Sequence, residues 1–97
     1  MKYIFNIKKV DIVNLNGKNL RESFEKQEGV SFEKYIGNMI YEQCNDIDVV
    51  NKAIEIHKGN EIELSEREKD LLVTCLTGKF MPFVERRILA QIIKIDE

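Results

Sequence analysis

The chain has 97 residues, a net charge of −2, 43% hydrophobic residues and 33% charged residues. This size suits one domain over residues 1–97, and the composition is that of an ordinary globular protein rather than a disordered one. The absence of a basic excess disfavours a dedicated nucleic-acid binder, and no run approaches the roughly 20 apolar residues of a membrane-spanning helix.

The first residues lack the pattern of a secretory signal. The apolar start is broken at once by Asn6 and Lys8, so the apolar stretch that a signal peptide needs is missing. The chain has two cysteines, Cys44 and Cys75, and both fall within helical patterns. We therefore expect a cytoplasmic protein whose cysteines are reduced core residues rather than a disulfide.

The first 24 residues read as extended chain. Apolar and aromatic residues alternate over 3–7, which predicts a strand, and 10–15 is a second such run. Asn16-Gly17 follows, the dipeptide best suited to a type I′ turn. Residues 18–24 would return as a third strand, before a polar loop at 25–30.

Helical periodicity dominates the rest of the chain. Four helices are predicted, with starts marked by the capping residues Ser31, Asp46 and Ser65 and by Pro82 at a first helical position. Glu68, three residues after Ser65, completes a capping box. Gly59 and Gly78 are placed to end helices in the left-handed conformation.

Two segments of the helical half leave more than one interpretation open. Residues 61–64 alternate in polarity over four positions, which fits a short edge strand joining the hairpin or an extended linker. The last helix is predicted to run from 82 to about 94 and is apolar over a wide arc. Such a helix is either central in the core or half of an interface.

Together these elements predict an α+β fold. An N-terminal β-hairpin or three-stranded antiparallel meander, within 1–24, would pack on three to four short helices within 31–95. The predicted core is Phe5, Ile7, Ile12, Tyr35, Ile36, Met39, Ile40, Val50, Ile54, Leu72, Leu76, Phe83, Val84, Ile88 and Ile92.

The sequence offers no metal or cofactor site. Its single histidine and two cysteines lack the close paired spacing of zinc ligands. A calcium loop starting at Asp46 fails, because Asn51 stands where glycine is needed and His57 where glutamate is needed. Helix capping accounts for Asp46 and Asp48 instead.

No catalytic group is predicted either, so we expect a protein that is not an enzyme. His57 could meet Cys44 or Cys75 across the helices, but nucleophilic catalysis needs a third group that orients the base. No such group is evident, and a histidine in the last turn of a helix is accounted for by the helix dipole. Cysteines on apolar faces are unreactive.

Residues 64–78 begin Leu-Ser-Glu-Arg-Glu, continue as an apolar helix and end in Gly78. This stretch resembles the opening of the LuxR-type helix-turn-helix. The resemblance implies two further helices, the second of which enters the major groove, whereas the chain has room for one. A DNA-binding regulator built on 65–94 would have the candidate contacts Lys79, Arg86, Arg87, Gln91 and Lys94. The simpler interpretation of these residues is a solvated helix face.

The whole layout also resembles small uncharacterised proteins of prophages and mobile elements. The features concerned are the Asn-Gly turn, a tyrosine-containing helix, an acidic helix cap, Glu-Ile-Glu-Leu-Ser-Glu and Pro-Phe-Val. This resemblance implies a non-enzymatic role and transfers no functional residue. We therefore expect a protein-interaction or assembly module, acting as a homo-oligomer or a small adaptor, with the DNA-binding regulator as the alternative.

Overall fold

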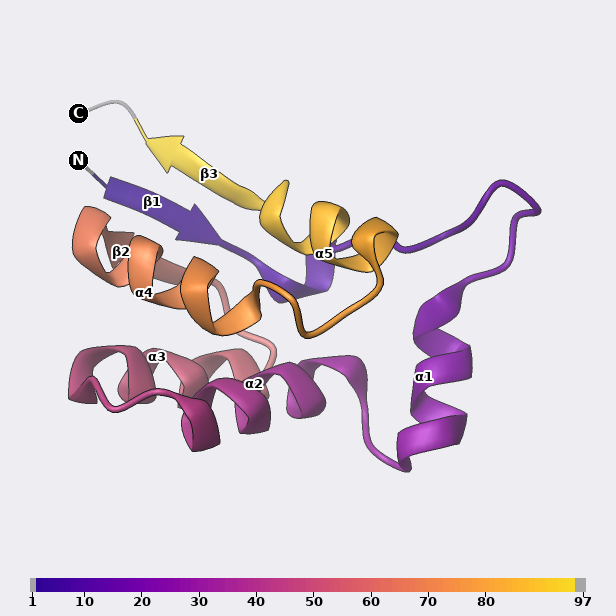
Figure 1. Ribbon diagram of the computed structural model, residues 1–97, viewed down its shortest axis with the longest axis horizontal. Coiled ribbons are helices and arrows are strands. Elements are labelled where there is room, and N and C mark those ends of the chain that lie inside the picture. The colour runs from indigo at the N-terminus through magenta and orange to yellow at the C-terminus, as the bar shows by residue number, and fades with distance from the viewer. Residues whose placement is uncertain (1, 96–97) are drawn as a thin grey trace.

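Three antiparallel strands form a sheet in the order β2-β1-β3 (Figure 1). The computed structural model describes residues 2–95. The central strand is β1 (Lys2–Phe5), and its neighbours are β2 (Ile62–Ser65) and β3 (Ile92–Ile95). The register places Tyr3 opposite Leu64 on one side and Lys94 on the other. The predicted α+β class with a three-stranded antiparallel sheet is confirmed.

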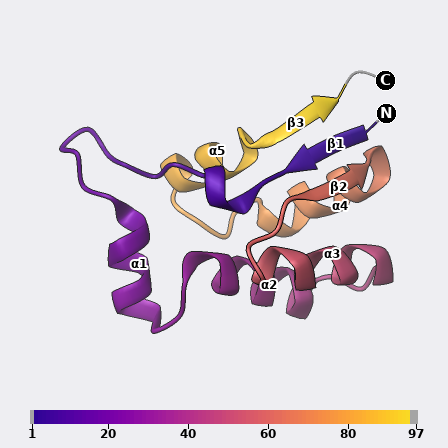
Figure 2. The same ribbon diagram turned by 180° about the vertical axis from the view of Figure 1, so that it is seen from behind.

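The helices lie mostly on one side of this sheet. Between residues 2 and 95 the structure has a short 3-10 helix and five α-helices, namely η1 (Ile7–Lys9), α1 (Leu20–Glu28), α2 (Phe32–Gln43), α3 (Ile47–His57), α4 (Glu66–Leu76) and α5 (Pro82–Leu89). α4 lies across one face of the sheet, and α2 and α3 run antiparallel beneath it (Figures 1 and 2). α1 projects from one end of the molecule.

The helix starts follow the predicted caps. Ser31 Oγ accepts a hydrogen bond from the Lys34 N–H at 3.3 Å, and Asp46 Oδ1 accepts from the Asp48 N–H at 3.0 Å. Ser65 and Glu68 form the predicted capping box, and Pro82 is the first residue of α5. These side chains satisfy backbone N–H groups that the first turn of a helix leaves unpaired.

The predicted strands at 10–15 and 18–24 are wrong. Residues 10–19 are irregular, with one isolated bridge between Val13 and Asn19, and the next nine residues form α1. A turn forms here, but it is not the predicted type I′ turn at Asn16-Gly17. Gly17 has a φ of +79° and Asn16 does not have a positive φ, and the Gly17 N–H bonds to the carbonyl of Asn14, which centres the turn on Leu15 and Asn16. Asn19 then caps α1 and ends the ladder, because its side chain accepts from the Arg21 N–H.

The sheet takes its outer strands from distant parts of the chain instead. Of the two alternatives for 61–64, the strand is confirmed, since Ile62–Ser65 pairs with β1. The predicted last helix is wrong at its end. It stops at Leu89, and Ile92–Ile95 forms β3 against the other edge of β1. The free edge of β1 therefore pairs with Ile92–Ile95, so these residues form a strand and not the last turns of the helix.

The core lies between the sheet and the helices, and it matches the prediction in part. Its buried residues are Phe5, Ile7, Val10, Ile12, Phe32, Ile36, Ile40, Val49, Ala53, Ile56, Ile62, Leu64, Leu72, Leu76, Val84 and Ile88. Tyr35, Met39, Val50, Phe83 and Ile92 were predicted to be core residues and are only partly buried. Ile54 was wrongly predicted to be buried and is 42% exposed, because α3 turns Val49, Ala53 and Ile56 inward.

Candidate functional site

The closest approach of two helices occurs at Gly37. A Cβ on this residue would lie 2.7 Å from the Cβ of His57 and 2.8 Å from its backbone nitrogen. No side chain larger than hydrogen fits there, so α2 and α3 cross almost in backbone contact. This crossing draws the two helices together at one point and leaves a groove beside it on their outer face.

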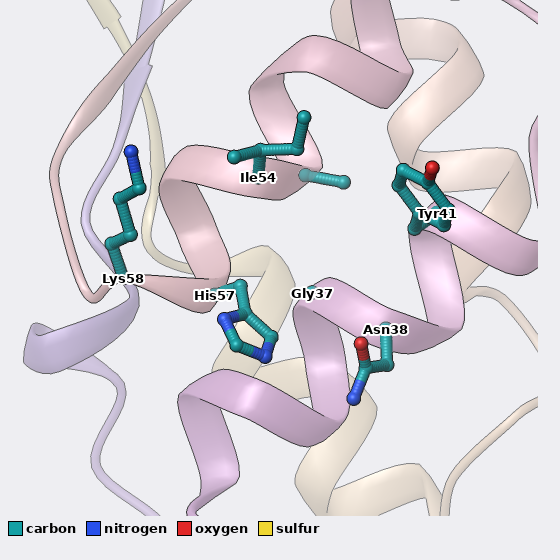
Figure 3. Close-up of a pocket in the computed structure, with 7 residues that line it drawn as sticks. Gly37, Asn38, Tyr41, Ile54, His57 and Lys58 are labelled. Atoms are coloured by element: carbon teal, nitrogen blue, oxygen red, sulfur yellow. The ribbon is translucent and has the colours of Figure 1, made fainter.

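The groove is mainly apolar. Its volume is about 200 Å³, and its lining residues are Gly37, Asn38, Tyr41, Ala53, Ile54, His57 and Lys58. Figure 3 shows these side chains around the crossing of α2 and α3. Tyr41 is 54% exposed and Ile54 is 42% exposed, so both present large apolar surface to solvent.

The apolar surface continues along α3 to its first turn. Ile47 lies seven residues before Ile54, hence on the same helix face, and is 73% exposed. We call the surface formed by Tyr41, Ile47, Ile54 and the groove the α2–α3 face. An isoleucine so exposed at the start of a helix gains nothing from the core of its own chain.

Charge is distributed unevenly along this face. Because the two helices are antiparallel, Lys34 near the start of α2 and Lys58 after the end of α3 lie at one end, and Glu42 lies at the other. Lys34 and Glu42 are both exposed, and within residues 2–95 neither forms an ion pair. The face therefore runs from a basic end through an apolar centre to an acidic end.

His57 lies at the crossing of α2 and α3. It is half-buried beside Gly37 in the last turn of α3, and its imidazole makes no hydrogen bond or ion pair with the described residues. Neither cysteine lines its groove. Instead, Cys44 and Cys75 lie together in a second hollow, shared with Asp46 and Arg67. The sequence suggested only that His57 could meet one of the two cysteines, and it did not predict that the cysteines lie near each other.

The candidate DNA contacts do not share one helix. Arg86 and Arg87 are exposed on α5, where both guanidinium groups lie over the ring of Phe83, at 6.0 and 5.5 Å from its centre. The other three candidates lie off α5: Lys79 in the turn before it, Gln91 in the turn after it and Lys94 in β3. A last helix that carries Arg86, Arg87, Gln91 and Lys94 was predicted wrongly, because α5 ends at Leu89, whereas Lys79 lies on the turn as predicted.

No family model, curated protein or solved structure matches the chain. The function has to be argued from the chain's own surfaces. In residues 2–95, no three His, Cys, Asp or Glu side chains are grouped so as to hold a metal ion. No helix in that range is long and apolar enough to cross a membrane.

Proposed function

We propose that this chain is a protein-interaction module that pairs with a second copy of itself through the α2–α3 face. The observation that supports this most directly is the exposure of Tyr41, Ile47 and Ile54 on one side of one helix pair. Full burial of an isoleucine side chain stabilises an association by about 1.5–3 kcal/mol. Each of these residues would contribute twice in a two-fold symmetric pair.

The charges favour one orientation of the two copies. A two-fold axis that crosses the helices lays α2 antiparallel over α2 of the second copy. Lys34 of each copy then lies over Glu42 of the other, and the apolar centres meet. An axis parallel to the helices would instead bring the basic ends together, and like charges facing each other oppose association. The first arrangement is the one we propose.

A second apolar surface offers a matched control. Ile93 and Ile4 lie opposite each other in the register of β1 and β3, and Ile93 is 48% exposed. The ring of Tyr3 lies against Lys69 of α4, so the neighbouring Ile4, and Ile93 with it, point to the other side of the sheet. The exposure of Ile93 is close to that of Ile54, yet the two residues lie on different faces of the molecule. The same substitution at both positions therefore separates a specific effect from a general loss of surface hydrophobicity.

Sedimentation equilibrium from micromolar to millimolar concentration tests the proposal. The native chain should dimerise, and Ile54→Lys should weaken the dimer by at least about 30-fold, the factor that corresponds to about 2 kcal/mol. Ile93→Lys should leave the dissociation constant within about threefold, a change below 1 kcal/mol. A monomer at every concentration would contradict the proposal, as would a dimer weakened by Ile93→Lys and not by Ile54→Lys.

Charge reversal tests the orientation. Lys34→Glu should weaken association, because it sets two acidic groups against each other, and adding Glu42→Lys should restore it. If the double variant associates as poorly as the single one, the two-fold axis does not cross the helices.

A DNA-binding function would show itself as affinity for duplex DNA that falls steeply with salt and is lost in Arg86→Ala with Arg87→Ala.

A further inference from the structure

The two cysteines are brought together from helices that are distant in the sequence. Cys44 ends α2 as its C-cap residue, with its N–H bonded to the carbonyl of Ile40 at 3.0 Å. Cys75 lies 31 positions later, in the last turn of α4. Both are free thiols, both are partly buried, and both line one open hollow of about 570 Å³ beside Asp46 and Arg67.

The side chain of Cys44 lies close enough to that of Cys75 to affect its ionisation. Burial raises the pKa of the Cys75 thiol to about 11, and Cys44 adds to this rise through its charge and a hydrogen bond between the two side chains, while Lys79 opposes it. Two thiols that line one hollow and influence each other in this way are neighbours in the fold. Because they also line an open hollow, a small oxidant has access to them.

We infer that Cys44 and Cys75 form a reversible modification site, which closes to an intramolecular disulfide when hydrogen peroxide or a similar two-electron oxidant is present. The sulfur of Cys44 attacks the peroxide, so that an S–O bond forms, the O–O bond breaks and the first water leaves. Cys75 then attacks the sulfenic sulfur, so that the S–S bond forms, the S–O bond breaks, and the departing hydroxide takes up the thiol proton of Cys75 to become the second water. Two thiols lose two electrons and two protons, and the peroxide becomes two waters.

The order of attack follows from the surroundings of Cys75. A thiolate is the attacking species in this chemistry, and a raised pKa keeps Cys75 protonated at neutral pH. Cys75 is therefore the second sulfur to react. The disulfide would join the end of α2 to the end of α4, closing a loop that includes α3 and β2. Closing such a loop restricts the unfolded chain, so the oxidised protein should melt roughly 10–20 °C higher.

Oxidation of the native chain, followed by mass spectrometry, tests the inference. After mild peroxide treatment the intact mass should fall by two hydrogens, and proteolysis should release one cross-linked pair of peptides containing Cys44 and Cys75. Dithiothreitol should restore the original mass and the original melting temperature. Cys75→Ser should gain oxygen on Cys44 instead of losing hydrogen, whereas Cys44→Ser, whose Cys75 stays protonated, should react little.

Two results would overturn the inference. One is a native chain that gains oxygen on Cys44 or Cys75 without losing hydrogen, which would mean that the sulfurs cannot meet. The other is a disulfide only between two molecules, seen as a covalent dimer under non-reducing conditions. The test is independent of self-association, because Ile54→Lys should oxidise like the native chain.

Discussion

Arg21 joins three segments of the chain through a single guanidinium group. Its Nε donates to the carbonyl of Val10 at 3.0 Å, its terminal nitrogens bond to the carbonyl of Ile7 and to Glu33, and the group lies 4.9 Å from the centre of the Phe32 ring. α1 buries no residue completely. Arg21 is therefore a principal attachment of α1 to the rest of the fold.

We predict that Arg21→Ala lowers the free energy of unfolding by about 2–3 kcal/mol, because the carbonyl of buried Ile7 and the carboxylate of Glu33 lose a charged donor. Urea denaturation measures the change. Lys26→Ala, at an exposed position of the same helix, should change stability by no more than about 0.5 kcal/mol. Equal effects of the two substitutions would show that Arg21 does not attach α1.

Glu33 makes the stability of this attachment depend on pH. Burial raises the pKa of its carboxyl, but hydrogen bonds from Arg21, Ser31 and its own backbone, with the charge of Arg21, outweigh burial and hold the pKa below the usual 4.5. A carboxyl with a depressed folded-state pKa stabilises the fold above its unfolded pKa. This contribution is lost as the pH falls through the lower, folded value.

The native chain should therefore lose more unfolding free energy than Glu33→Gln when the pH is lowered from about 7 to about 3. The difference in stability between the two proteins should narrow over this interval, as measured by urea denaturation at each pH. A difference that stays constant or widens on acidification would mean that the Glu33 carboxylate gains nothing from Arg21.

At the scale of elements, the contact between α2 and α3 depends on one missing side chain. Gly37→Ala would push a methyl group into the backbone of His57. Overpacking costs about 1–3 kcal/mol, and the better helix propensity of alanine returns about 1 kcal/mol. We predict a net loss of up to about 2 kcal/mol in the free energy of unfolding, measured by thermal or urea denaturation. Asn38→Ala, one residue along the same helix, should be neutral or slightly stabilising.

The capping residues made the helix starts predictable, but the long-range partners of the strands were not. The observed turn is centred on Leu15 and Asn16, one residue before the predicted position, and its ladder stops after one bridge between Val13 and Asn19. In the register of this bridge a longer hairpin would have set Asp11 against Arg21, whose guanidinium group bonds instead to the carbonyls of Ile7 and Val10 and to Glu33. The alternative is helix α1, whose residues are mostly strong helix formers. Residues 20–28 therefore form a helix capped by Asn19, and not the third strand that the Asn16-Gly17 dipeptide indicated.

The end of the chain shows a second limit of sequence patterns. Ile88, Ile92 and Ile95 fit helical spacing, and no glycine or proline marks a stop after Leu89. The stop comes from tertiary structure, because β1 offers an edge to which four residues rich in β-branched side chains can pair. The strand order β2-β1-β3 depends on such distant pairings, which no local pattern encodes.

The same limit applies to the candidate surface. In α3, Val49 stands next to Val50 and Ala53 next to Ile54. From the sequence, either neighbour of each pair could therefore face the core. Packing selected Val49, Ala53 and Ile56. The misplaced residue, Ile54, is the one that the structure exposes in the groove. The proximity of Cys44 and Cys75 likewise arises from how α2 and α4 pack.

At the scale of the whole molecule, one small core supports two exposed apolar surfaces, the α2–α3 face and the open side of the sheet. A domain of this size buries only about 60–65% of its unfolded surface, so its stability margin is thin. Association that buries the α2–α3 face would add to that margin. The melting temperature of a dimer should then rise with protein concentration.

Isotope-filtered nuclear Overhauser spectroscopy tests this association most directly, on a mixture of labelled and unlabelled native chains at millimolar concentration. The account predicts intermolecular contacts in which α2 meets α2 and α3 meets α3, above all between the methyl groups of Ile54 in the two copies. Intermolecular contacts confined to Ile4 and Ile93, or a complete absence of such contacts, would contradict it.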